Sequence, residues 1–158
     1  MQAFRIKGGK KLKGEVRPQG AKNEALQIIC ATLLTPDKVI INNIPDIIDI
    51  NKLISLLISL GVKVEKLNSN KYSFKADNID LDYLKSEQFK IDGKSLRGSI
   101  MIVGPLLARF GKAYIPRPGG DKIGRRRLDT HFEGLIKLGA KFSYLSLIHI
   151  SEPTRRLS

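Results

Sequence analysis

The chain has 158 residues and contains one pattern twice, and this internal repeat constrains its fold more than any other feature. Leu33-Leu34 recurs as Leu106-Leu107, 73 positions later. Leu60-Gly61 recurs as Leu138-Gly139, 78 positions later. Self-similarity at a nearly fixed spacing is typical of scaffolds built from repeated supersecondary units. The sequence therefore predicts two copies of one unit.

Each copy begins with a segment that is apolar on almost every side, at residues 25–34 and again at residues 100–108. A helix that is apolar all round is usually buried, so we expect two buried helices. The second segment contains Gly104-Pro105. Because proline inside a helix costs about 3 kcal/mol or more, we expect a bend near Pro105.

The rest of each copy follows from hydrophobic spacing and glycine stops. In the first copy, β-branched residues predict a strand at 38–42, and apolar residues spaced three and four apart predict a helix over 50–58 that ends before Gly61. Further strands are expected at 62–65 and 72–75, and a helical turn at 81–85. The second copy predicts a strand at 112–115, a helix ending at Leu138 and a strand from Lys141. Ahead of both copies, residues 4–7 and 12–16 predict a basic hairpin around Gly8-Gly9.

The second copy carries five extra residues between Pro118 and its amphipathic helix, since the spacing of matched positions grows from 73 to 78. This insertion contains glycines and Asp121, and the arginines Arg125, Arg126 and Arg127 follow just before the helix. Cations at a helix start are disfavoured by about 0.3–1 kcal/mol each. A bound phosphate or diphosphate would compensate for them, while a solvated basic turn is the competing interpretation.

Two further positions can hold an anion. Lys22 and Asn23 fall in the first turn of the first apolar helix, although a lysine there is often only exposed. Gly93-Lys94-Ser95 lacks the upstream glycine of a phosphate loop, because Gln88 stands at that position, but Arg97 nearby can still bind an anion. His131 takes the place that Leu53 has in the first copy. This favours a hydrogen-bonded histidine at the edge of the core over a catalytic base.

Composition limits the partners. A net charge of +13 favours anionic partners, yet aromatic residues make up only 6% and none is interleaved with the basic clusters as a base-stacking surface requires. Small phosphates are therefore favoured over nucleic acid, with a basic nucleic-acid module as the alternative. No apolar run approaches the ~18 residues of a membrane span, so no membrane partner is expected.

The cysteine and histidine residues give no sign of thiol, metal or nucleophile-elbow chemistry. Cys30 is the single cysteine and lies in an apolar run, so we expect a buried thiol and a reducing, cytoplasmic location. No histidine or cysteine pair has the spacing of metal ligands, and the motif of a nucleophile elbow is absent. We therefore expect no metal and no cofactor.

Several motifs together resemble the UDP-N-acetylglucosamine 1-carboxyvinyltransferase family. They are Gly20-Ala21-Lys22-Asn23, the run from Gly104 to Gly111, Pro118-Gly119-Gly120 with Ile123-Gly124, and Asp129 with His131 ahead of Leu138-Gly139-Ala140. The resemblance covers residues 4–142 in order. The sister 5-enolpyruvylshikimate-3-phosphate synthase has Asp-Lys-Ser and Ser-His-Arg patterns near its first helix, where this chain has Ala-Lys-Asn-Glu-Ala. A synthase of that type remains an alternative.

The resemblance implies an α/β fold in which each of two domains is an inside-out barrel of three repeated units, with helices inside and sheets outside. Residues 1–21 would be a leading β-hairpin that packs with the second domain, and residues 22–142 would form about two of the three units of the first domain. Residues 143–158 resemble translated adapter sequence and are expected to be a non-native tail.

The resemblance also implies a reaction. The 3-hydroxyl of UDP-N-acetylglucosamine would attack phosphoenolpyruvate and phosphate would leave, which is the first committed step of peptidoglycan synthesis. Lys22 and Asn23 would bind phosphoenolpyruvate. The UDP-sugar would be bound by six residues: Arg97, Arg126, Arg127, Leu128, Asp129 and Thr130. This chain alone would be inactive, because the family's other active-site residues lie beyond its end.

Asp121 stands in the loop position that donates a proton, where the family usually has cysteine, and Arg127 stands where proline is usual. A carboxylic acid is normally ionised at neutral pH, and Lys122 and Arg125 would lower its pKa further. Asp121 can be the acid only if closure over an anionic substrate raises its pKa. Because fosfomycin alkylates a thiolate, the aspartate predicts insensitivity to it.

Overall fold

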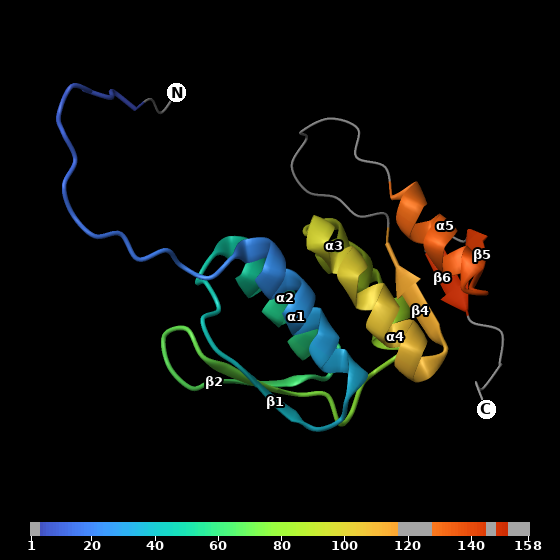
Figure 1. The fold of residues 1–158 in the computed structure, drawn as a ribbon. Coiled ribbons are helices and arrows are strands. Elements are labelled where there is room, and N and C mark those ends of the chain that lie inside the picture. Colours follow the sequence, from blue (N-terminus) through green and yellow to red (C-terminus); the bar gives the residue numbers. More distant parts are fainter. Residues whose placement is uncertain (1–3, 117–127, 145–147, 152–158) are drawn as a thin grey trace.

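The computed structural model describes residues 4–116, 128–144 and 148–151, and its helices and strands form two similar units (Figure 1). The first unit contains α1 (Lys22–Ala31), the 3₁₀ helix η1 (Thr32–Leu34), β1 (Lys38–Ile41), α2 (Ile48–Ser59), β2 (Lys63–Lys66) and β3 (Tyr72–Lys75). A connection follows with η2 (Tyr83–Lys85) and α3 (Glu87–Lys94). The second unit contains η3 (Arg97–Ile102), α4 (Val103–Phe110), β4 (Lys112–Ile115), α5 (Asp129–Lys137), β5 (Lys141–Tyr144) and β6 (Ile148–Ser151).

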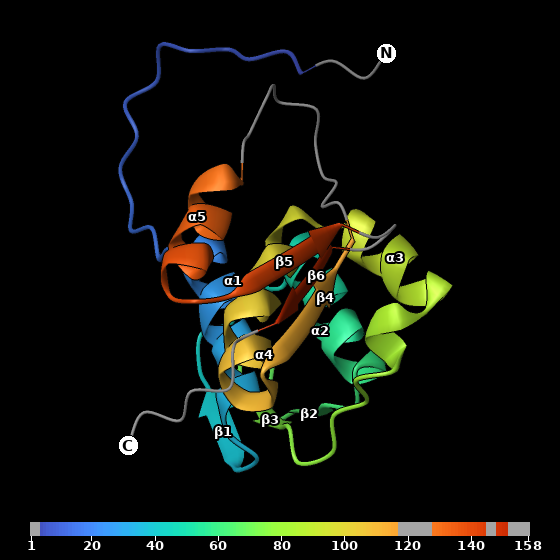
Figure 2. The same ribbon diagram turned by 90° about the vertical axis from the view of Figure 1, so that its right-hand side faces the viewer.

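The two units have equivalent antiparallel sheets. The strand order is β1-β3-β2 in the first and β4-β6-β5 in the second, so the last strand lies in the middle of each sheet (Figure 2). The register is also the same, because Lys75 pairs with Lys38 and Lys63. Its counterpart Ser151 pairs with Lys112 and Lys141. The predicted repeat is confirmed.

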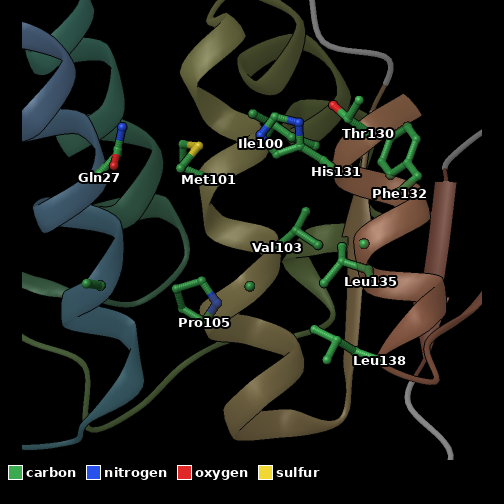
Figure 3. Close-up of a pocket in the computed structure, with 13 residues that line it drawn as sticks. Gln27, Ile100, Met101, Val103, Pro105, Thr130, His131, Phe132, Leu135 and Leu138 are labelled. Carbon is green, nitrogen blue, oxygen red and sulfur yellow. The ribbon is translucent and has the colours of Figure 1, made fainter. Parts of the chain in front are cut away.

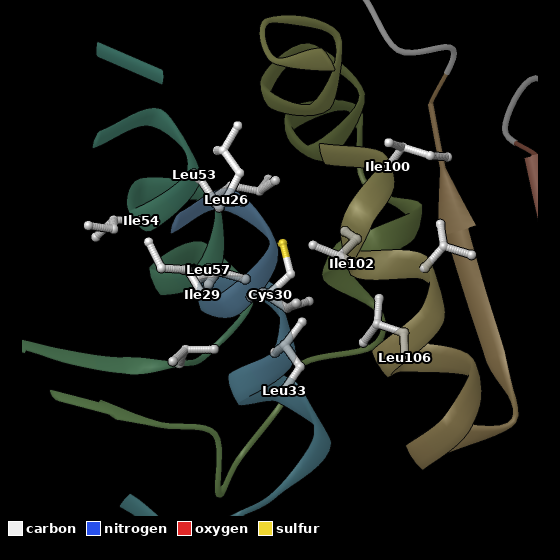
Figure 4. Close-up of a cluster of buried hydrophobic side chains, with 14 of the residues drawn as sticks. Leu26, Ile29, Cys30, Leu33, Leu53, Ile54, Leu57, Ile100, Ile102 and Leu106 are labelled. Carbon is white, nitrogen blue, oxygen red and sulfur yellow. The ribbon is translucent and has the colours of Figure 1, made fainter. Parts of the chain in front are cut away.

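The core lies where α1, α2 and the η3–α4 segment meet, and its fully buried side chains include Ile29, Leu33, Leu53, Leu57, Ile102 and Leu106. Figure 4 shows that these helices run in the same direction. Leu26, Leu53 and Ile100 lie toward one end, and Leu33, Leu57 and Leu106 toward the other. Each helix therefore starts at the same end of the molecule.

The predicted glycine stops are confirmed. Gly61 after α2 and Gly139 after α5 have φ angles of 101° and 98°, and Gly111 after α4 has a φ of 68°. Glycine adopts this left-handed region at no steric cost, so these residues end the helices, and Gly61 and Gly139 do so at matched places in the two units.

Both apolar helices differ from expectation in detail. Helix α1 is buried on one face only, because Ile28 is 42% exposed and Leu34 at the end of η1 is 52% exposed. Pro105 lies in the first turn of α4 rather than inside a longer helix. The N–H groups of a first turn have no acceptor within the helix, so proline costs little there. The segment changes from a 3₁₀ helix to an α-helix at Val103, two residues before Pro105.

The predicted leading hairpin is wrong for this structure. Residues 4–21 contain no strand, and Phe4, Ile6, Leu12 and Val16 are 87–97% exposed. A two-stranded hairpin without a core to cover is marginal in water, which explains its absence. The packing of residues 1–21 with a second domain stays a prediction.

Strand β6 falls within residues 143–158, the predicted non-native tail, and takes the central place that β3 has in the first sheet. The origin of the tail stays a prediction. Within the described residues, no helix is long and apolar enough to span a bilayer.

Candidate functional site

The described candidate residues all lie where the parallel helices begin. Lys22 and Asn23 open α1, Arg97 opens η3, and Leu128 precedes α5, which starts with Asp129 and Thr130. Figure 3 shows that α5 runs alongside the η3–α4 segment, with Thr130 and Ile100 at one end and Leu138 and Pro105 farther along. Helix starts carry partial positive charge and unpaired N–H groups, so this end of the molecule suits an anion.

Gly20 fixes how the chain enters α1. A Cβ atom at Gly20 would lie 1.9 Å from the carbonyl oxygen of Asn43 and 3.1 Å from Cδ of Pro45. Asn43 itself has a φ of 59°, and asparagine tolerates this conformation better than most residues. The close approach of these two backbones sets the first turn of α1 beside the start of α2.

A residue of α2 holds the side chain of Lys22. Its ammonium group forms an ion pair with the carboxylate of Asp49, in the first turn of α2. The side chains are 49% and 37% exposed, so both remain open to a ligand. Asn23 is also exposed. Ala21, the residue before α1, has no side-chain oxygen to accept from the first-turn N–H groups, which leaves them for another acceptor.

Arg97 is brought to the same place by its neighbours. A Cβ atom at Gly98 would lie 3.2 Å from Cδ1 of Leu26, one turn beyond Lys22 on α1. On the other side, Nζ of Lys52 lies 3.5 Å from the carbonyl oxygen of Ser95, and Lys52 is one turn beyond Asp49 on α2. The start of η3 therefore rests against the starts of both α1 and α2, with Arg97 partly buried.

The start of α5 faces these helices across an apolar pocket of about 460 Å³ (Figure 3). Gln27 of α1, Met101 and Val103 of the η3–α4 segment, and Leu135 of α5 line it. His131 also lines the pocket and is exposed, whereas its counterpart Leu53 is fully buried. The expectation of a histidine packed at the core edge is corrected, because His131 lies on the exposed side of α5, while Leu128, Phe132 and Leu135 pack against the core.

The other candidate residues at the start of α5 differ in their exposure to solvent. Leu128 and Asp129 are partly buried and Thr130 is exposed on the pocket side. Thus the structure places Lys22, Asn23 and Arg97 at the starts of neighbouring helices, and α5 faces α1 and the η3–α4 segment across a pocket that none of these three residues lines. Asp121, Arg126 and Arg127 lie outside the described residues, so their roles stay predictions.

Asp49 is the site residue that the sequence analysis missed. It lies far from Lys22 in the sequence, and an acidic residue in the first turn of a helix is usual without any ligand. One signal in the sequence could have suggested the contact. Lys22 falls at the start of one predicted helix and Asp49 at the start of the next.

Two further kinds of site, a reactive thiol and a metal-ion site, have no support in the described part of the chain. Burial raises the pKa of the Cys30 thiol to about 12, so Cys30 stays a neutral part of the core. In residues 4–116, 128–144 and 148–151, histidine, cysteine and acidic residues form no cluster of three that could hold a metal ion.

Comparison with known proteins finds similar chains. The chain is 62% identical over 144 residues to the UDP-N-acetylglucosamine 1-carboxyvinyltransferase of Bacteroides thetaiotaomicron, covering 91% of this chain and 33% of the relative. It is 56% identical over 154 residues to the Porphyromonas gingivalis protein of the same name, covering 98% and 36%. The chain therefore spans about a third of the length of these curated relatives.

The fold matches a solved structure. The enolpyruvyl transferase NikO from Streptomyces tendae superposes with a TM-score of 0.64 at 19% sequence identity, covering 92% of this chain and 31% of NikO. A sequence profile described as EPSP synthase (3-phosphoshikimate 1-carboxyvinyltransferase) matches residues 6–151. The chain belongs to the EPSP synthase family.

Proposed function

We propose that the complete protein transfers the enolpyruvyl group of phosphoenolpyruvate to the 3-hydroxyl of UDP-N-acetylglucosamine. The observation that carries this proposal is the meeting of helix starts that gathers Lys22, Asn23 and Arg97 at one end, with the start of α5 across the pocket. The identity of 62% to a relative named for this reaction supports the choice of substrates.

Lys22 and Asn23 bind phosphoenolpyruvate in this proposal. The ammonium group of Lys22 has three N–H donors, of which Asp49 accepts one, so two remain for the phosphate. A fixed cation near the phosphate stabilises the charge that develops as it departs. Asn23 and the first-turn N–H groups of α1 add neutral donors to the same anion.

The start of α5 and Arg97 hold the UDP-sugar. Arg97, Arg126 and Arg127 neutralise the diphosphate through guanidinium N–H groups, which match phosphate oxygens in geometry. Asp129 accepts hydrogen bonds from the nucleotide, and Leu128 and Thr130 flank it, with Thr130 on the side of the pocket. This placement orients the sugar hydroxyl toward phosphoenolpyruvate near Lys22.

The chemistry runs in two balanced steps. The sugar 3-hydroxyl gives its proton to a base as its oxygen bonds to C2 of phosphoenolpyruvate, while C3 gains a proton from an acid and becomes a methyl group. Phosphate then leaves C2 with its bonding electrons as C3 gives a proton to a base, which restores the double bond. Asp121 is the proposed proton donor for the first step and must be protonated for that role. A carboxylate at this position is a poor target for fosfomycin, so the protein is proposed to be insensitive.

The proposal requires more chain than is present here. Two repeated units account for part of an inside-out barrel, and a third unit with the second domain would complete it. The pocket and the exposed apolar side chains Ile28, Ile136 and Leu138 give such units a surface to cover. The 158-residue chain alone is therefore proposed to be inactive, and the proposal includes no nucleic-acid or membrane partner.

The acceptor can be tested against the one named in the family description, which is 3-phosphoshikimate. A chimera would carry residues 1–142 of this chain followed by the remaining two thirds of the Bacteroides thetaiotaomicron relative. We expect phosphate release that requires phosphoenolpyruvate and UDP-N-acetylglucosamine together. Faster release with shikimate 3-phosphate would contradict the proposed acceptor.

The same chimera tests the site. Lys22→Gln should lower kcat/KM for phosphoenolpyruvate by about 100-fold or more, because one charge contact to a transferring group contributes about 3 kcal/mol. The matched control is Lys38→Gln, which removes an exposed lysine on β1 and should leave turnover unchanged. Equal loss in both variants would mean that overall charge, not the site, determines activity.

A further inference from the structure

We propose that Asp49 is a positioning residue for Lys22 in enolpyruvyl transfer. This inference rests on the proposed function. The carboxylate on α2 holds the ammonium group of Lys22, on α1, at the place where the two helices begin. Asp49 acts through Lys22 and does not itself contact the reacting atoms.

The two partners differ in how firmly the fold holds them. Ile50, next to Asp49, is fully buried, and so is Leu53 one turn later. The short side chain of Asp49 therefore starts from a fixed backbone. The side chain of Lys22 is 49% exposed and has a flexible four-carbon stem. Asp49 consequently sets where the ammonium group stands, and the reverse does not hold.

The contact leaves Lys22 able to act on substrate. An ammonium group donates up to three hydrogen bonds, and the ion pair uses only part of this capacity. The pair also neutralises a cation in the first turn of α1, where the helix dipole disfavours it. Without Asp49, Lys22 would sample many rotamers in water, and a ligand would have to order it.

Opposing effects act on substrate binding. Asp49 pre-orders Lys22, which strengthens binding, but its negative charge repels the phosphate, which weakens it. These effects partly cancel in the ground state. Geometry matters more in the transition state, where a misplacement of about 1 Å can lower the rate by about 100-fold. Removal of the carboxylate should thus change kcat more than the KM for phosphoenolpyruvate.

The test uses the full-length chimera and steady-state kinetics. Asp49→Asn should lower kcat about tenfold and change the KM for phosphoenolpyruvate by less than about threefold. In a Lys22→Gln background, Asp49→Asn should have less than about a twofold further effect, since Asp49 acts through Lys22. Asp49→Glu should recover at least about half of the lost kcat on a logarithmic scale.

Asp46→Asn is the matched control. Asp46 lies three residues before Asp49, just ahead of α2, accepts a hydrogen bond from Nδ2 of Asn51 at 2.9 Å and lies 3.8 Å from Nζ of Lys66. This variant should keep the parent kcat, and thermal melting should show that every variant is folded.

The outcomes separate the inference from the proposed function. A folded parent chimera without transfer activity overturns the proposed function, and the role of Asp49 with it. With an active parent, an Asp49→Asn kcat within about twofold of the parent overturns the inference, as does an equal loss in both Lys22 backgrounds. If Lys22→Gln has no measurable turnover, the kcat of Asp49→Glu becomes the deciding measurement. A kcat of Asp49→Glu no higher than that of Asp49→Asn would then contradict a positioning role for Asp49.

Discussion

Arg109 joins the two repeated units, and its removal should destabilise the fold. This residue lies on α4 of the second unit, but its Nη1 donates hydrogen bonds to two carbonyl oxygens of the first unit. The acceptors are the carbonyl oxygens of Leu33 in η1, at 3.0 Å, and of Ala76 after β3, at 2.8 Å. The guanidinium carbon also lies 4.9 Å from the ring centroid of Phe110.

The magnitude follows from these contacts. A hydrogen bond from a charged donor contributes about 1.5–3 kcal/mol, and partial burial places both bonds near the lower end. Arg109→Met keeps most of the aliphatic stem but removes both donors, so we expect a loss of about 3 kcal/mol in the free energy of unfolding. Arg109→Lys keeps the charge but not the planar fork, and should lose about half as much.

Urea denaturation of the 158-residue chain, followed by circular dichroism, measures this effect. The midpoint should fall while the slope with denaturant stays the same, because the surface exposed on unfolding hardly changes. Lys112→Met is the control, since Lys112 is exposed at the start of β4. If Arg109→Met and the control differ by less than about 0.5 kcal/mol, Arg109 does not join the units.

Three further predictions concern single residues. Gly20→Ala should lower the melting temperature and weaken phosphoenolpyruvate binding in the chimera, because its Cβ would lie 1.9 Å from the Asn43 oxygen; an unchanged melt would contradict this. Hydrogen bonds from Lys75 and then Lys63 hold the pKa of Asp77 down at about 2, so its stabilising effect is present above pH ~4 and lost as the pH falls through 2. The stability difference between parent and Asp77→Asn should therefore shrink between pH 5 and pH 2, as urea midpoints can show. Asp121→Cys should make the chimera sensitive to fosfomycin in a time-dependent inactivation assay, and continued insensitivity would count against the role of this loop position.

Local patterns predicted the repeated part of the fold well. The apolar spacing of residues 50–58 and the glycine stops correspond directly to α2, α5 and the ends of both. These features depend on residues close in sequence, which pattern analysis can use. Helix α3 was missed because its sequence is polar. Its start could have been predicted, because serine is a favoured residue just before a helix. In the structure, the hydroxyl oxygen of Ser86 accepts a hydrogen bond from the N–H of Phe89 at 3.1 Å.

Contacts between distant segments were not predictable. The ion pair between Lys22 and Asp49 and the bonds of Arg109 to Leu33 and Ala76 depend on how α1, α2 and α4 pack. The leading hairpin failed for a related reason, because its strand propensity was judged without knowing whether anything covers Phe4 or Val16. The sequence placed Lys22 and Arg97 at helix starts, as the structure does, while their roles in a site stay predictions.

We propose that the substrates bind where the parallel helices begin, and hydrogen exchange of the chimera can locate the bound ligands. Exchange is compared with and without UDP-N-acetylglucosamine and phosphoenolpyruvate, using peptides that cover residues 1–142. We expect slower exchange on ligand binding at residues 20–26, 47–52, 95–100 and 128–132, with β1, β2 and β3 unchanged. Protection confined to the strands, or to the grafted two thirds alone, would contradict it.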